Sequence, residues 1–416
     1  MIKKIERNKN LIIYLSGLTI SNIGNAFTSL ILPLMLLDLT NSPLQLSIVS
    51  AINFLPYAIL GIPCGALIDK LNIKKVMQNS DLIRFVIYLL LSIVCMSNNN
   101  SFIIIGIYVT SIISGVCYVF HSISEVTAIP KVVKEKDLSK ANSYIYGSQY
   151  VVGLVVPMIG GSLYKINIVG IFFLFDSITF LISYLSLIMI NWKEELYNID
   201  TKYIRVKSIY NDIILGFKKL LGEKNILSIL VILTSTNILL VSYNNYILVY
   251  LKETLNYSSD KIGTIIGITS IGALIGSIIA TKLITNIDMY KLIIVTIFID
   301  CISRIIISAS KNIGILVTFI TLTYLLQAVL NITIITVRQK DISEEYLGRV
   351  NSVFKTLSLG VRPIGYIIGG VFMSKLGVVY TLQLTGLLCL LISIYSLIKL
   401  RNGKNILNKE NNGQLL

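Results

Sequence analysis

The sequence has little charge and few of the side chains that catalytic and metal sites require. Only 14% of its 416 residues are charged, whereas a soluble domain carries about a quarter. A single histidine removes most catalytic arrangements, so we do not expect an enzyme. The five cysteines stand singly in apolar runs, without a CxxC pair, which predicts free thiols and no metal site. No GxxxxGK(S/T) loop occurs, so we expect neither ATP coupling within the chain nor a cofactor.

Long hydrophobic runs are what the sequence has instead. Hydrophobic residues make up 54% of the chain, and the runs recur from Leu11 almost to Leu400. A bilayer needs about 20 apolar residues per helix, so the runs predict an all-α membrane protein with twelve transmembrane helices. Residues 1–10 are basic and precede the first run without a cleavage signature, which indicates a first span and not a removed signal peptide. The expected spans are 11–37, 44–68, 76–97, 101–129, 142–164, 168–191, 225–251, 260–283, 290–309, 312–337, 348–373 and 377–399.

One long polar connection separates the sixth span from the seventh. It contains a basic amphipathic segment, Tyr203 to Leu221. We expect this segment to lie on the cytoplasmic membrane surface and to tether the two halves of the chain. The chain is thereby divided into an N-terminal six-helix bundle (1–191), a linker (192–224), a C-terminal six-helix bundle (225–400) and a tail (401–416).

The distribution of lysine and arginine predicts the orientation. With the N-terminus inside, 27 basic residues fall on the inner side, 5 in outer loops and 4 within spans. Positive residues of short loops stay in the cytoplasm, so we expect both termini there, in a bacterial inner membrane. The same asymmetry explains the net charge of +15, and no stretch has the pattern of a nucleic-acid module. The bilayer, and not nucleic acid, is the expected partner.

Two stretches at an offset of 209 residues indicate an internal repeat. Residues 121–161 align without gaps onto residues 330–370, with eleven identities in 41 positions. The identities include a polar position, Asn142/Asn351, that apolar composition does not explain. Because the match pairs spans 4 and 5 with spans 10 and 11, the two halves are expected to cross the membrane in the same direction.

The loop after the second span carries a family motif. It reads Gly65-x3-Asp69-Lys70-x-Asn72-x-Lys74-Lys75, which resembles the loop motif Gly-x3-Asp-(Arg/Lys)-x-Gly-x-(Arg/Lys)-(Arg/Lys) of the major facilitator superfamily. We expect asparagine at the middle glycine position to be tolerated, because asparagine also adopts the left-handed conformation. The resemblance implies two six-helix bundles related by a pseudo-two-fold axis along the membrane normal. It also implies a conformational latch made of Gly65, Asp69, Lys70, Lys74 and Lys75.

Further features resemble the multidrug, macrolide-efflux and siderophore-exporter branch of that superfamily. They are Leu138-Ser-Lys-Ala-Asn142-Ser after span 4, Asp176 in span 6, and Pro157-Met-Ile-Gly160-Gly161, which matches the end of an antiporter signature. The resemblance implies a proton-coupled exporter, an efflux antiporter, of a small amphipathic compound such as a macrolide or another drug. A siderophore, peptide or lipid exporter, a nutrient importer and a membrane sensor or scaffold without transport are alternatives. The expected partners are the substrate and protons, and the expected unit is a monomer.

Polar side chains recur on one face of spans 1, 4, 7 and 10, which line the cavity in this family. Spacings of three and four residues place the members of each group on a common helix face. The candidates for the substrate cavity are Asn22, Asn25, Ser29, Tyr118, His121, Ser122, Asn237, Asn244, Gln327 and Asn331.

Ionisable groups within spans are costly and are therefore candidates for function. His121 and Glu125, one turn apart, are candidates for proton coupling, although Glu125 lies near the inner boundary and could pair with a loop lysine instead. Asp176 is a further candidate, because no basic residue lies within a turn of it. Two sets at helical spacing are expected to be structural charge pairs. They are Asp81 with Arg84 and Asp300 with Arg304.

Span 11 contains two cations, Lys355 and Arg362, and each could have one of two roles. A cation at this place could attract an anionic substrate, or it could neutralise a buried acid such as Asp176. The sequence favours neither role.

Overall fold

A computed structural model describes residues 2–68, 71–97, 99–132, 138–164, 169–190, 214, 218, 220–222, 224–342, 350, 353–354 and 356–413. All regular secondary structure among these residues is helical. This agrees with the predicted all-α fold, in which every backbone N–H and C=O group within the bilayer is satisfied inside its own helix.

The first six helices form one bundle, which we call the N-bundle. Within it α3 packs on α4 and α6, and α1 packs on α5 and α6. Its helices are α1 (Ile2–Thr40), α2 (Pro43–Ile68), α3 (Ile73–Cys95), α4 (Asn100–Val132), α5 (Leu138–Tyr164) and α6 (Val169–Met189).

The remaining helices form the C-bundle, in which two of the expected spans are broken. The seventh consists of α8 (Lys224–Leu240), α9 (Tyr243–Val249) and a π-helical turn, η3 (Tyr250–Thr254); the eighth consists of α10 (Ser259–Thr269) and α11 (Ile271–Asn286). The others are α12 (Met289–Ala309), α13 (Ile313–Asp341) and α15 (Arg362–Gly413). Side-chain caps start two of them, because the carboxylate of Asp288 accepts the Lys291 N–H at 2.9 Å and Asn312 accepts the Gly314 N–H at 2.8 Å.

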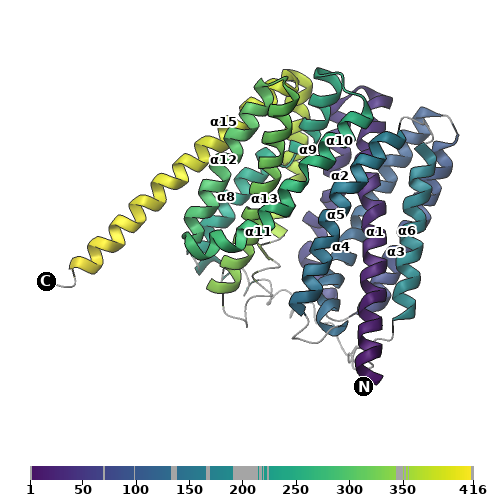
Figure 1. Cartoon of the computed structure of the whole chain (residues 1–416), viewed down its shortest axis with the longest axis horizontal. Helices are drawn as coiled ribbons and strands as arrows, with labels where there is room; N and C mark the ends of the chain where they lie inside the picture. The colour runs from purple at the N-terminus through teal and green to yellow at the C-terminus, as the bar shows by residue number, and fades with distance from the viewer. Residues whose placement is uncertain are drawn as a thin grey trace.

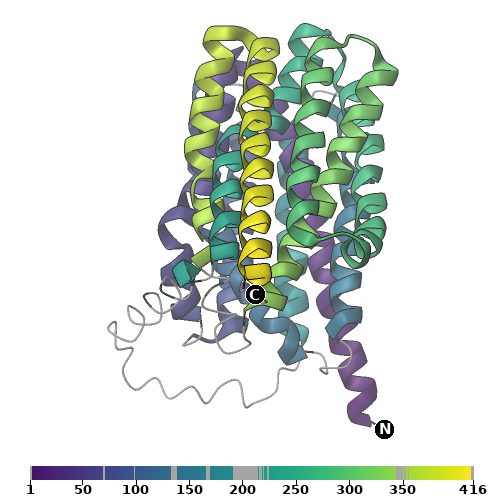
Figure 2. The same cartoon turned by 90° about the vertical axis from the view of Figure 1, so that its left-hand side faces the viewer.

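The count of spans fits twelve. Among the described residues, ten helical segments are long and apolar enough to cross a membrane. The fifth expected span is α5, a helix of 27 residues that is not among these ten. Residues 356–395 count as one segment of 40 residues, but Gly377 has φ 78° and ψ 161° and breaks it. Figure 2 shows the chain rising as a yellow-green helix and returning beside it as a yellow one. The chain is therefore a multi-pass membrane protein.

The two bundles approach each other at one face and diverge toward the face that carries the N-terminus (Figure 1). We call these the far face and the N-terminal face. Between the bundles, α2 packs against α15 and α5 packs against α10. Large apolar side chains cover the outside; Ile278 is 74% and Leu391 is 61% exposed, as suits contact with lipid. Beyond residue 400, α15 continues away from the bundles to Gly413 (Figure 1).

Candidate functional site

The polar groups of α1 and α13 differ in how far they are exposed. Asn22, Asn25 and Gln327 are half-buried, whereas Ser29 and Asn331 are exposed. The side-chain nitrogen of Asn22 is buried and has no hydrogen-bond partner. An amide nitrogen left in this way is costly unless something else binds it. Asn22 is thus the member of this group with unused hydrogen-bonding capacity.

The candidates on α4 face two different environments. Tyr118 is 49% exposed, whereas His121 is only 8% exposed. Ser122 donates its hydroxyl within the helix, to the Val119 carbonyl at 3.2 Å. Glu125 is half-buried one turn beyond His121. The helix therefore presents Tyr118 to open space and turns His121 into the bundle.

Two of the three asparagines Asn237, Asn244 and Asn245 of the seventh span bond to other helices. Asn237 donates to the Ser358 carbonyl at 3.1 Å, which ties α8 to the start of the eleventh span. Asn244 is exposed. Its neighbour Asn245, which sequence reasoning did not select, is buried and donates to the Ser50 hydroxyl of α2 at 3.0 Å. This bond joins the C-bundle to the N-bundle.

Asp176 of α6 is fully buried, with an exposed fraction of 0%. Thr28 of α1 donates a short hydrogen bond to its carboxylate, and the Thr179 hydroxyl lies 3.3 Å from the other carboxylate oxygen. Gly24 leaves the room for this contact, because a Cβ there would lie 3.0 Å from Asp176 Cγ. Among the residues that the structure describes, no cation lies within 4.0 Å of the Asp176 carboxylate, Arg362 included. This acid is held by hydroxyl groups alone.

Asp81 of α3 contacts α4 and α6. Its Oδ1 lies 3.4 Å from Nε2 of His121, and its Oδ2 accepts the Ser183 hydroxyl at 2.7 Å. All three side chains are buried. Sequence reasoning selected Asp81 and His121 separately and did not bring them together, because they lie on different helices.

The expected pair of Asp81 with Arg84 is wrong. No ion pair within 4.0 Å joins these two described residues, although their spacing on α3 permits one. The reason is that each side chain finds another partner. Asp81 turns to His121, and the Arg84 guanidinium lies over the Phe180 ring at 5.1 Å and the Tyr118 ring at 5.8 Å. Arg84 is 4% exposed and its Nε has no hydrogen-bond partner.

The structure brings together the other expected pair, Asp300 and Arg304 of α12. The Arg304 Nε and Nη2 donate to the same oxygen of Asp300 at 2.9 and 2.8 Å. The guanidinium also lies 3.8 Å from the centre of the Tyr243 ring of α9. The two buried charges of α12 are therefore paired with each other, whereas Arg338 of α13 is buried with no carboxylate within 4.0 Å among the described residues.

Three of the five expected latch residues can be placed in part. Lys74 donates to the carbonyls of Ile188 and Ile190 at 3.2 and 2.9 Å, at the end of α6, and Lys75 is exposed. Gly65 lies in α2. Asp69 and Lys70 lie outside the described residues, as do Lys355 and most of the linker helix expected over 203–221.

Asn72, at the middle glycine position of the motif, is not left-handed as we expected. It has φ −70° and ψ 100°, and its side chain accepts the Lys75 N–H at 3.1 Å. An asparagine replaces the glycine here because it caps the N-terminus of α3.

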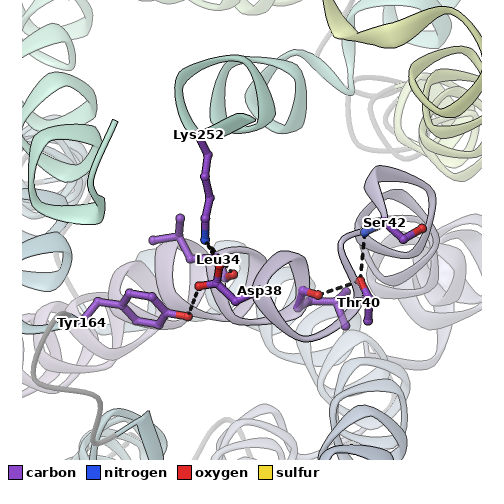
Figure 3. A network of polar contacts seen from close by, with 7 residues as sticks. Leu34, Asp38, Thr40, Ser42, Tyr164 and Lys252 are labelled. Carbon is purple, nitrogen blue, oxygen red and sulfur yellow. Dashed lines mark hydrogen bonds and ion pairs between the residues drawn. The ribbon is translucent and has the colours of Figure 1, made fainter. Parts of the chain in front are cut away.

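At the far face, a polar cluster joins the two bundles (Figure 3). Lys252 projects from η3 and forms an ion pair with Asp38 of α1. Its Nζ also lies 3.4 Å from the Leu34 carbonyl. Tyr164, at the end of α5, donates its hydroxyl to the other Asp38 oxygen at 2.7 Å. We call Asp38, Tyr164 and Lys252 the far-face cluster.

Sequence reasoning missed the far-face cluster. Lys252 was counted as a loop lysine, and Asp38 follows the end of the first expected span. The sequence does place an acid, Asp38, and a lysine, Lys252, at the same ends of spans 1 and 7, which are equivalent helices of the two repeats. This placement predicts a contact only when it is known that the two bundles meet at this face.

Glycine contacts close the same face. Gly161 of α5 and Gly263 of α10 touch, since a Cβ on either would lie 2.9 Å from the Cα of the other. A Cβ on Gly370 of α15 would lie 2.9 Å from the Ser47 hydroxyl oxygen of α2. Small residues allow helices to approach this closely within a membrane. The bundles therefore meet backbone to backbone at the far face.

All five cysteines are free, as expected. Among the described residues, no group of three or more histidine, cysteine, aspartate or glutamate side chains has the arrangement of a metal site.

Comparisons with known proteins agree with this architecture. The family model described as Major Facilitator Superfamily matches residues 14–361 and residues 230–414. Macrolide efflux protein A of Streptococcus pyogenes is 25% identical over 395 residues, which are 91% of this chain and 93% of that protein. Both matches extend over nearly the whole chain.

Solved structures show the same fold. A bacterial homologue of the iron transporter ferroportin in an inward-facing state has a TM-score of 0.69 at 16% identity, over 93% of this chain and 98% of that chain. Its outward-facing state with soaked iron has a TM-score of 0.60 at 15% identity, over 93% and 98% of the two chains.

Proposed function

This chain belongs to the Major Facilitator Superfamily, and we propose that it is a proton-coupled exporter of a small amphipathic compound such as a macrolide. Family membership makes it a membrane transporter of small molecules and not an enzyme. Export is supported by the likeness to macrolide efflux protein A. We propose a monomer as the working unit, because one chain contributes both bundles.

The proposed orientation has both termini in the cytoplasm. It is supported by the 27 basic residues on that side against 5 on the other. The far face is then external, and the contacts across it belong to an inward-open state. Export would proceed by rocking of the bundles, in which these contacts break while the N-terminal face closes.

The observation that carries the proton coupling is an unmatched buried charge in the N-bundle. Asp81 and Asp176 supply two carboxylates, Arg84 supplies one cation, and His121 can be neutral or charged. With both acids ionised and His121 neutral, the group holds one uncompensated negative charge in a low-dielectric interior, which is expensive. One bound proton removes this charge. Loss and recovery of that proton is the chemistry that an antiporter needs.

Within this group Asp176 is the proposed carrier. Its partners Thr28 and Thr179 are hydroxyl groups, which can donate to a carboxylate and accept from a carboxylic acid. Thr28 lies on α1, so protonation changes a contact of a helix that lines the cavity in this family. Substrate binding near α1 and proton binding at Asp176 would then influence each other through Thr28.

The experiment is transport by the purified chain in proteoliposomes with an imposed proton gradient and a labelled macrolide. We expect Asp176→Asn to reduce gradient-driven transport by about tenfold or more, because an amide cannot carry the proton. Exchange of substrate without a gradient should persist, since the cavity is intact. Glu253→Gln, which alters an exposed acid of the C-bundle, is the matched control and should behave as the unmodified chain.

Two results would contradict the proposal. If Asp176→Asn keeps full coupling, Asp176 is not the carrier. If macrolide export continues unchanged after the proton gradient is collapsed, the transporter is not a proton antiporter. Gradient-driven uptake into cells, in place of export, would identify an importer.

A further inference from the structure

Arg362 lies in a membrane-spanning helix at the place where the two bundles meet. It begins α15 and belongs to the span of residues 356–395. Two residues before it, Gly360 packs on α2, because a Cβ there would lie 3.4 Å from the Cα of Ala58. One turn before it, the Ser358 carbonyl accepts the hydrogen bond from Asn237 of α8. Arg362 thus borders both bundles and one candidate residue of the substrate cavity.

Among the residues that the structure describes, the Arg362 guanidinium has no counter-charge within 4.0 Å. Its Nε is buried without a hydrogen-bond partner. Of the two roles that the sequence left open, neutralisation of Asp176 is absent, because that acid is held by Thr28 and Thr179. A cation within a span is expensive unless it is paired. This one keeps donors available for an anion.

A pair of stacked aromatic rings lies beside this cation. The guanidinium lies 5.1 Å from the centre of the Phe54 ring of α2. Tyr366, one turn along α15, stacks on the same ring with centres 5.8 Å apart and planes 21° apart. Arg362, Phe54 and Tyr366 are all half-buried, so they are not sealed in the core. The two rings come from different bundles and form one apolar surface beside the charge.

We propose that Arg362, Phe54 and Tyr366 form a substrate subsite for an oxyanion attached to a planar apolar group. The planar fork of an arginine binds carboxylate or phosphate through paired N–H groups, and ring faces bind flat apolar groups. The subsite selects amphipathic acids among the compounds that the chain exports, and so rests on the proposed function. A substrate bound here touches both bundles. Its release therefore depends on the movement of one bundle relative to the other.

Two dyes that share one ring system but differ in charge test the subsite. Carboxyfluorescein is anionic and rhodamine 6G is cationic, and binding of each to the purified chain in phosphatidylcholine nanodiscs is measured by fluorescence anisotropy. Arg362→Gln should weaken carboxyfluorescein binding roughly tenfold or more, which corresponds to the loss of one charge-assisted pair, and should leave rhodamine 6G unchanged. Phe54→Leu should weaken both dyes several-fold, because it removes the ring and keeps the charge.

The matched control is Arg338→Gln. Arg338 is likewise buried, lies 4.3 Å from the Phe354 ring and has no carboxylate within 4.0 Å among the described residues, but it lies on α13. It should not change the preference between the dyes. Unfolding temperatures of all variants, measured alongside, separate a lost subsite from a lost fold.

The outcomes separate this inference from the proposed function. Failure of the unmodified chain to bind carboxyfluorescein, or an unchanged dye preference in Arg362→Gln, would overturn the subsite even if macrolide export is proton-coupled. Loss of carboxyfluorescein binding when phosphatidylglycerol is added to the nanodiscs would assign Arg362 to a lipid phosphate and also overturn it. If the subsite behaves as expected but transport ignores the proton gradient, the coupling fails and the subsite stands.

Discussion

The third helices of the two bundles treat buried charge in different ways. In the C-bundle, Asp300 and Arg304 form an ion pair on one helix at 2.8 and 2.9 Å. In the N-bundle, Asp81 turns from Arg84 to His121 and Ser183 on other helices. The same kind of helix, the third of its half, thus carries a closed pair in one bundle and an open network in the other. The two halves of the internal repeat thus share their helical arrangement but differ in how their buried charged side chains are paired.

This difference favours the N-bundle as the place of the proposed proton coupling. A matched pair has one stable charge state, and changing it leaves an unpaired buried charge. An unmatched network has several arrangements of similar energy that differ by one proton and in which helices are joined. We therefore expect the proposed proton binding to change contacts between helices in the N-bundle, whereas the pair on α12 of the C-bundle serves stability.

The largest expected effect is a loss of stability when the pair of Asp300 and Arg304 is broken. Asp300→Asn leaves Arg304 buried without an anion and should lower the free energy of unfolding by about 3 to 5 kcal/mol. Asp81→Asn should cost much less, because Oδ1 of Asp81 has no hydrogen bond to lose and the amide oxygen can still accept the Ser183 hydroxyl. Thermal unfolding of both purified variants measures the difference.

A double variant sharpens the same comparison. Asp300→Leu with Arg304→Met replaces the pair by apolar side chains and should recover most of the lost stability. If Asp81→Asn unfolds as readily as Asp300→Asn, both bundles depend equally on their buried acids and the contrast between them is wrong.

The next effect concerns pH. His121→Gln removes a group that can hold the proton beside Asp81, 3.4 Å away, so the remaining acids must titrate without it. We expect the pH dependence of transport to change, because the charge beside Asp81 then no longer depends on an imidazole. The profile is measured in proteoliposomes at fixed gradient, with Ser80→Ala of α3 as control because that hydroxyl donates to the Val76 carbonyl of its own helix at 2.8 Å. An unmoved profile would remove His121 from the network.

The fold could be predicted from the sequence because each feature used is either local in the chain or a sum over many residues. Apolar run length gave the spans, and the offset between residues 121–161 and 330–370 gave the repeat. Even the pair at Asp300 and Arg304 follows from spacing on one helix. Such features need no knowledge of how helices are placed against one another.

The site could be predicted only in part, because its contacts join different helices. Spacing alone favours Asp81 with Arg84, yet His121 on α4 competes for the same carboxylate. Gly24 was not selected, although its missing Cβ is what lets α1 approach Asp176. Asn244 and Asn245 differ by one position, and only the packing of α9 against α2 determines that the second one is buried.

The smallest expected effect is at the far-face cluster, where the two bundles touch. The Asp38 and Lys252 side chains are 45% and 18% exposed, and exposed ion pairs contribute only about 0.2 to 1 kcal/mol. Asp38→Asn and Lys252→Gln should each shift the population toward the form open at this face by at most a few-fold, and the double variant should add little. Distances between spin labels at the exposed residues Ser101 and Lys311 report the shift. Lys261→Gln, which alters a lysine that packs on Tyr257 within the C-bundle, should cause none. Additive effects of the two single variants would mean that the ion pair does not hold the bundles together, and the glycine contacts alone would then close this face.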